Sequence, residues 1–280
     1  MKLFTGAKIN ICLKILNRRK DGYHGISTVF QELDFGDELA IERVKKGCQF
    51  SSNVNWLKND ESNLCVQAWM KMKTLFPQVE GVKITLKKQI PSGAGLGGGS
   101  SNAGGMIKGL NTLFELNLST NDMEDIASKI GADVPFFIQG GTQKGEGIGD
   151  ILTVLSQGIK GAVLLVIPEI HISTSWAYSM IKNKLDNITE SPNFVGFFQD
   201  NYFPETIFKN DFEKLIFPAY PEIGRIKTTL IDLGAIFAGL SGSGSTVYGI
   251  FNDDTLIKSA ELHFKSSYQT IIANPIPSST

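Results

Sequence analysis

The sequence predicts a fold that mixes α-helices and β-strands. Apolar and polar residues alternate from Ala7 to Ile15, which indicates a strand with two different faces, and Lys8 and Asn10 point to the same side of it. Apolar residues at helical spacing between Asn63 and Leu75 indicate a helix, with polar residues just upstream as a start signal. The uninterrupted apolar run from Gly161 to Ile167 indicates a buried strand.

The other elements follow in chain order. A charged turn is predicted at residues 17–24, and an extended segment interrupted at Gly36-Asp37 is predicted at residues 29–43. A strand is predicted at residues 82–86, and helices are predicted at residues 106–114 and 123–130. For residues 183–220 we expect only short helices and loops. A hinge is expected between residues 153 and 168, so that residues 1–155 and 156–280 form an N-terminal and a C-terminal domain.

Composition excludes several classes of function. The chain has 280 residues, of which 42% are hydrophobic and 20% charged, and its formal net charge is −1. It therefore has no global positive excess that would attract nucleic acid or an anionic membrane. Cys12, Cys48 and Cys65 lack the paired short spacings of a zinc or redox motif, and we expect buried thiols. Because no apolar run approaches the roughly 20 residues that span a bilayer, we expect a cytoplasmic protein.

A dense glycine run precedes the helix expected at residues 106–114. We call residues 91–101 the glycine loop; it reads Pro91, Ser92, Gly93, Ala94, Gly95, Leu96, Gly97, Gly98, Gly99, Ser100 and Ser101. Without side chains, successive backbone amides can approach an oxyanion, and the following helix presents its positive end. The two serines add hydroxyl donors. The pattern favours an anion-binding loop over a purely structural one.

Two other nucleotide motifs fit this loop poorly. Gly93 to Gly98 satisfies the dinucleotide pattern G-x-G-x-x-G, with Glu115 as the nominal ribose acid. However, Pro91 intervenes after the strand and Glu115 falls towards the end of a helix instead of a second strand. A P-loop is disfavoured because no Gly-Lys-Ser or Gly-Lys-Thr closes the run.

Three separated segments together resemble the GHMP kinase superfamily. They are the strand with Lys8, the glycine loop, and the run from Gly239 to Ser245. Three further segments, at residues 7–10, Asp21-Gly22-Tyr23-His24, and Gly131-Ala132-Asp133-Val134-Pro135-Phe136-Phe137, resemble the diphosphocytidyl-methylerythritol kinases within that superfamily. One departure is Gly25, where many members of this family carry an acidic residue.

The resemblance implies a fold and a reaction. It implies a two-domain α+β fold, with an N-terminal domain like ribosomal protein S5 domain 2 and a ferredoxin-like C-terminal domain. It also implies transfer of the ATP γ-phosphoryl group to the 2-hydroxyl of 4-diphosphocytidyl-2-C-methyl-D-erythritol, with Mg²⁺ bound mainly through phosphate oxygens. Another GHMP kinase, acting on homoserine, mevalonate or a sugar, and a catalytically silent nucleotide-binding module are the alternatives.

The resemblance also assigns roles to residues. Lys8 and Asp133 would form the catalytic pair, and the glycine loop would hold the ATP phosphates. From the residues alone, Asp133 could instead cap a helix or turn, and as a catalytic group it could accept the hydroxyl proton or only orient the hydroxyl. The implied substrate-binding residues, for a partner with a cytidine diphosphate group, are Asn10, Tyr23, His24, Thr174, Tyr178, Ser241, Gly242, Ser243 and Gly244. Tyr23 and Tyr178 would sandwich the cytosine, although Trp176 competes with Tyr178 for that role.

Overall fold

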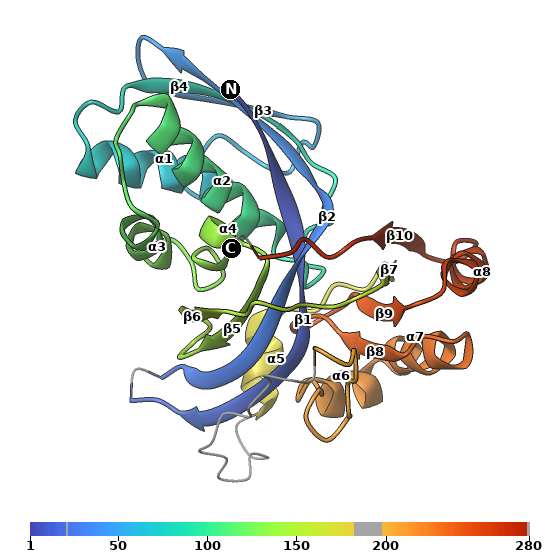
Figure 1. Ribbon diagram of the computed structural model, residues 1–280. Helices are drawn as coiled ribbons and strands as arrows, with labels where there is room; N and C mark the ends of the chain where they lie inside the picture. The colour runs from blue at the N-terminus through green and yellow to red at the C-terminus, as the bar shows by residue number, and fades with distance from the viewer. Residues whose placement is uncertain (21, 182–197, 279–280) are drawn as a thin grey trace. The chain divides into compact units, whose positions relative to one another are not determined.

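The computed structural model describes residues 1–20, 22–181 and 198–278 (Figure 1). The chain forms two compact units that interleave in the sequence. Unit 1 comprises Met1–Ala7, Gly36–Ser92 and Gly97–Gly140, and unit 2 comprises Lys8–Phe35, Gly93–Leu96 and Gly141–Thr280. Each unit contains both strands and helices, which agrees with the predicted α+β class. The expected boundary near residue 155 stays a prediction.

Unit 1 is a small sheet covered by helices. The second half of β2 (His24–Val44) pairs antiparallel with β4 (Gly81–Lys87), and β3 (Cys48–Ser52) runs parallel to β4. Helices α1 (Leu64–Leu75) and α2 (Gly98–Leu113) pack against each other, and α3 (Thr120–Ser128) and the short α4 (Phe136–Gln139) lie beside α2. Their apolar faces form one core with the inner side of the sheet, and that core includes Met72, Ile84, Met106 and Leu110.

The predicted interruption at Gly36-Asp37 is wrong, because β2 runs through both residues without a break. A Cβ atom at Gly36 would lie 2.4 Å from the backbone oxygen of Thr5 and 2.6 Å from the ring of Phe4. The glycine therefore permits a close approach of two strands and does not mark a turn. Asp37, which also suggested a turn, is fully buried.

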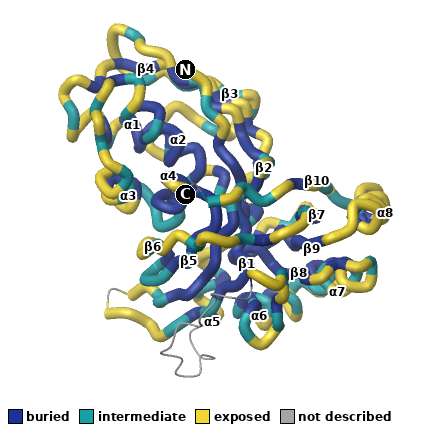
Figure 2. The backbone as a smooth tube through the Cα atoms, viewed as in Figure 1, coloured by how far each residue is buried: buried dark blue, intermediate teal, exposed yellow. Residues whose placement is uncertain are grey.

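Unit 2 contains a second sheet with helices of its own. Strands β7 (Ala162–Ile167), β8 (Phe237–Leu240), β9 (Val247–Phe251) and β10 (Gln269–Ala273) lie in the order β10-β7-β9-β8, and every pair is antiparallel. The helices are α5 (Thr174–Ile181), α6 (Glu213–Ala219), α7 (Pro221–Asp232) and α8 (Asp254–Phe264), and α7 and α8 pack on these strands. Figure 2 shows β7 and β9 buried, whereas α8 exposes much of its surface.

Unit 2 also holds most of the long strand β1 (Lys2–Arg18) and the first half of β2. Thr28 to Gln31 of β2 pair antiparallel with β5 (Thr142–Glu146), which pairs in turn with β6 (Ile151–Val154). The predicted strand at residues 7–15 is confirmed as part of β1, and the strand at residues 161–167 is confirmed as β7.

The helix predictions are confirmed, with differences at the ends. Helix α2 begins at Gly98 and not at the predicted Met106, so residues 98–101 of the glycine loop form its first turn. Helix α1 begins after Asn63, whose Oδ1 accepts a hydrogen bond of 2.9 Å from the Cys65 amide. Helix α3 begins three residues before the predicted Met123, because Ser119 and Asp122 form a capping box there. Residues 182–197, part of the segment expected to form short helices and loops, lie outside the described residues.

Two further expectations concern the burial of the cysteines and the presence of a membrane-spanning helix. Cys12 and Cys65 are buried, and burial raises the pKa of each thiol to about 12, whereas half-buried Cys48 has a pKa of about 11 for the same reason. Thiols of this kind remain protonated at neutral pH and are poor nucleophiles. Among the described residues, no helix has the length and apolar character needed to cross a bilayer.

Candidate functional site

Lys8 and Asn10 lie on one face of β1 in unit 2, as the alternation of residues predicts. The Lys8 ammonium donates a hydrogen bond of 2.5 Å to Asn10 Oδ1 and lies 5.2 Å from the centre of the Phe30 ring. The Lys8 residue is 4% exposed, so its charge is largely removed from water. A cation in such a place is costly unless polar groups or an anionic ligand compensate it.

Two residues that sequence reasoning missed support this strand. Thr28 Oγ1 accepts a 2.8 Å hydrogen bond from Asn10 Nδ2 and donates one of 2.6 Å to the Cys12 carbonyl. The Tyr248 hydroxyl, on β9, donates to the backbone oxygen of Asn10 at 3.0 Å. Burial raises the pKa of Tyr248 well above its usual value, so its hydroxyl stays a donor. Thr28 thus orients the side-chain amide of Asn10, and Tyr248 holds the backbone of the same residue.

The part of the glycine loop that belongs to unit 2 lies against the Lys8 strand and the loop after β8. Leu96 accepts a backbone hydrogen bond of 3.0 Å from the Lys8 amide, and Ser241 Oγ donates one of 2.8 Å to the Gly95 carbonyl. A Cβ at Gly95 would lie 2.1 Å from the Ser241 backbone oxygen, and the φ of Gly95 is +77°. Only glycine permits both this conformation and this approach.

The loop from Ser241 to Gly244 is fixed by polar side chains. Asn210 is 4% exposed, and its Nδ2 donates to the carbonyls of Leu240 at 2.8 Å and Gly242 at 2.7 Å. The hydroxyls of Thr174 and Ser243 lie 2.9 Å apart. Sequence reasoning missed Asn210, because it lies in a segment without a recognisable motif.

The predicted base-binding aromatics fall into two groups. The rings of His24 and Tyr178 stack with their centres 5.9 Å apart and an angle of 17° between their planes. Tyr178 also packs edge-on against Phe212, with centres 5.0 Å apart. Tyr23 is 63% exposed, and Trp176 meets Tyr220 edge-on. Asp21, the first residue of the motif that contains Tyr23 and His24, lies outside the described residues.

Unit 1 holds the remaining predicted residues. Gly97 has φ +68° and ψ 15° and starts helix α2 with no side chain capping it, so the first amides of the helix point out of its N-terminus. Ser101 is 2% exposed and Ser100 is half-buried. Asp133 is half-buried in the turn before α4.

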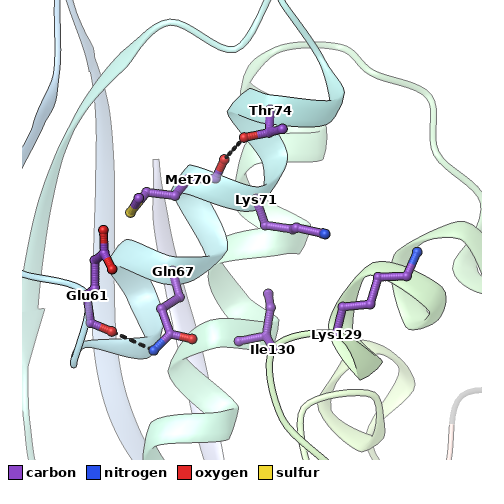
Figure 3. Close-up of a pocket in the computed structure, with 7 residues that line it drawn as sticks. All are labelled: Glu61, Gln67, Met70, Lys71, Thr74, Lys129 and Ile130. Carbon is purple, nitrogen blue, oxygen red and sulfur yellow. Dashed lines mark hydrogen bonds between the residues drawn. The ribbon is translucent and has the colours of Figure 1, made fainter.

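Unit 1 also contains a surface pocket between α1 and α3 (Figure 3). Its lining residues are Glu61, Gln67, Met70, Lys71, Thr74, Lys129 and Ile130. Gln67 Nε2 donates to the Glu61 backbone carbonyl at 2.6 Å, and Thr74 Oγ1 donates to the Met70 backbone carbonyl at 2.9 Å. These polar groups of the pocket lining are therefore already hydrogen-bonded to neighbouring lining residues. None of the predicted site residues lines this pocket.

Comparison with known proteins places the chain in a family. Residues 63–141 match the family described as GHMP kinases N terminal domain, and residues 195–269 match GHMP kinases C terminal. A 4-diphosphocytidyl-2-C-methyl-D-erythritol kinase of Chlorobium luteolum is 37% identical over 275 residues, which cover 96% of this chain and 95% of the relative. One of Bacteroides fragilis is 39% identical over 280 residues, covering 96% and 99%. The chain belongs to this family of GHMP kinases.

Solved structures agree with this placement. A crystal structure described as 4-(cytidine 5'-diphospho)-2C-methyl-D-erythritol kinase superposes with a TM-score of 0.85 at 26% identity, covering 98% of this chain and 99% of that one. A homoserine kinase from Cytophaga hutchinsonii, at 16% identity and a TM-score of 0.75, shares the fold over 98% of this chain and 94% of its own. The two-domain GHMP kinase fold is therefore confirmed, and the chain is an ATP-dependent small-molecule kinase.

Proposed function

We propose that this kinase transfers the γ-phosphoryl group of ATP to the 2-hydroxyl of 4-diphosphocytidyl-2-C-methyl-D-erythritol. The products would be the 2-phosphate and ADP, in the non-mevalonate route to isoprenoid precursors. The observation that carries the choice of acceptor is the stack of His24 and Tyr178 in unit 2, the unit that also holds Lys8. Homoserine, mevalonate and simple sugars contain no base that such rings would bind.

The aromatic residues would bind the cytosine. A base stacked on an aromatic side chain gains about 1 to 3 kcal/mol, and the exposed ring of Tyr23 can supply a second face. His24 would read the polar edge of the base. The hydrogen-bonded hydroxyls of Thr174 and Ser243, with the loop from Ser241 to Gly244, would contact the rest of the acceptor.

The glycine loop would hold the ATP phosphates. Successive glycines keep side chains away from the backbone, and the uncapped N-terminus of α2 presents amide donors and the positive end of the helix dipole. The hydroxyls of Ser100 and Ser101 would add donors. A cluster of at least three His, Cys, Asp or Glu side chains suited to a metal is absent from the described residues. Mg²⁺ is a hard cation that would bind mainly to phosphate oxygens and neutralise their charge.

Lys8 and Asp133 would act at the reacting hydroxyl. Lys8 would stabilise the negative charge on the transferred phosphoryl group, and its hydrogen bond to Asn10 holds the ammonium in place. Asp133 would accept the proton of the hydroxyl or orient it for attack. Both roles are consistent with a loose transition state, in which the proton leaves late.

The test is the rate of ADP formation with a panel of acceptors. We expect ADP to form only when 4-diphosphocytidyl-2-C-methyl-D-erythritol is present, and the phosphate to be found on its 2-hydroxyl by NMR. Homoserine, mevalonate and galactose serve as controls. A higher kcat/KM with any of these would overturn the choice of acceptor, and ATP consumption independent of every acceptor would contradict acceptor phosphorylation.

We expect Tyr178→Ala to raise the KM for the cytidine substrate about tenfold to a hundredfold, from the loss of roughly 1 to 3 kcal/mol of stacking. The KM for ATP should hardly change, because ATP is assigned to the glycine loop. The matched control is Trp176→Ala, since this ring packs edge-on against Tyr220. Steady-state kinetics with each substrate varied in turn give the result. If only Trp176→Ala raised the KM for the cytidine substrate, the ring that stacks on the base would be Trp176 and not Tyr178.

A further inference from the structure

A fully buried carboxylate in unit 1, Asp37, receives four hydrogen bonds from residues around the glycine loop. Its Oδ1 accepts from the backbone amides of Gln89 at 2.6 Å and Ile90 at 2.8 Å. Its Oδ2 accepts from the Lys88 ammonium at 2.5 Å and from Asn102 Nδ2 at 2.8 Å. Every lone-pair direction of this carboxylate is therefore used inside the protein.

The partners of Asp37 lie on both sides of the glycine loop in the sequence. Lys88 to Ile90 directly precede Pro91, and Asn102 directly follows Ser101 in helix α2. A single side chain on β2 thus connects the residues just before the glycine loop with the residue just after it. Asn102 Nδ2 also donates to Thr5 Oγ1 at 2.9 Å, which connects the same network to β1.

The Lys88 ammonium lies against the first turn of α2. A Cβ at Gly98 would lie 2.7 Å from Lys88 Nζ, so the glycine leaves room for the ammonium. A cation beside the positive end of a helix is unfavourable unless an anion compensates it, and Asp37 is that anion. A buried ion pair adds little stability compared with apolar residues of similar size. We therefore interpret the Lys88–Asp37 pair by the groups that it connects and not by its contribution to stability.

We propose that Asp37 is a positioning residue for ATP, which keeps the two ends of the glycine loop at a fixed separation before the nucleotide arrives. A loop that is already ordered loses less conformational entropy on binding, and its amides are aimed before the phosphates reach them. The inference rests on the proposed role of the loop in binding ATP. Asp37 itself acts only through Lys88, Asn102 and the two amides.

We expect Asp37→Asn to raise the Kd and KM for ATP about tenfold or more, because its amide would turn a donor towards groups that are themselves donors. The KM for the cytidine substrate should stay within about threefold, since the base is assigned to unit 2. Calorimetry of ATP binding to the full chain gives the Kd independently of turnover. Asn102→Ala removes only one of the four contacts, and should raise the Kd for ATP in the same direction by a smaller factor.

The control is Met72→Ala, which opens a cavity in the core of unit 1 and lowers its stability without touching the network. Its Kd for ATP should equal that of the wild type. Unchanged ATP affinity in a folded Asn102→Ala or Asp37→Asn protein would overturn the inference, as would an equal loss of affinity in Met72→Ala. Gly97→Val distinguishes the role of the loop from the role of Asp37. If Gly97→Val weakens ATP binding and the Asp37 variant does not, the loop binds ATP and only the positioning role of Asp37 is wrong.

Discussion

Asp133→Asn is expected to lower turnover at least about a hundredfold, while ATP and the cytidine substrate still bind with nearly unchanged affinity. The amide is close in size to the carboxylate but can neither accept the hydroxyl proton nor carry the negative charge. Asp125→Asn is the matched control, because Asp125 is an exposed carboxylate on α3 in the same unit. Single-turnover measurements of phosphoryl transfer separate the chemical step from product release. Turnover within a few-fold of the wild type would remove Asp133 from the mechanism.

The double variant tests whether Asp133 and Lys8 act together. Lys8→Met should also reduce turnover, because it removes a cation from the strand face where Asn10 Oδ1 orients it. If the two groups serve one step, the combined loss will be far smaller than the product of the two single losses. Independent, multiplicative losses would contradict a catalytic pair.

Gly97→Val is expected to weaken ATP binding by at least about tenfold in a protein that remains folded. Gly97 has φ +68°, and this conformation costs a branched residue on the order of 1 to 3 kcal/mol, so the start of α2 would shift away from its present geometry. Its side chain would also stand where a phosphate is proposed to approach the backbone. Calorimetry with ATP and the steady-state KM for ATP provide two readings.

Gly47→Val separates backbone strain from the effect on the site. Gly47 belongs to the same unit and has φ +76°, and nothing lies within 4 Å of the position of its Cβ. The variant should therefore lose similar stability, measured by thermal unfolding, and keep the wild-type affinity for ATP. Equal weakening in both variants would mean that the change at Gly97 acts through general strain.

The sequence predicts the local elements better than the contacts between distant segments. Helix α1 and strands β4 and β7 follow from apolar spacing and local start and stop signals. Gly36-Asp37 misleads because a glycine next to an aspartate is typical of a turn, whereas the cause here is the approach of β1, some thirty residues away in the chain. Nothing local in residues 36–37 encodes that neighbour.

The same limit applies to the candidate site. Lys8 and Asn10 are detectable because strand alternation places them on one face, and the glycine loop is detectable from its composition. Asn210 and Tyr248 carry no such signal, because each donates a hydrogen bond to a backbone carbonyl that is far away in the sequence. A lone asparagine among polar residues and a tyrosine within an apolar strand look like ordinary surface and core residues.

The interleaved composition of the two units has a consequence for how the polypeptide emerges from the ribosome. Unit 1 can be complete once residue 140 has left the exit tunnel, whereas unit 2 needs residues 8–35 together with strands that are translated last. The apolar face of β1 that packs with Leu164 and Leu240 must wait for more than half of the nascent chain. During that interval this apolar face lacks its packing partners, which exposes it to aggregation and to capture by chaperones. Slow translation after residue 140 would prolong this exposure, and the yield of folded enzyme would then depend on elongation speed in the second half of the message.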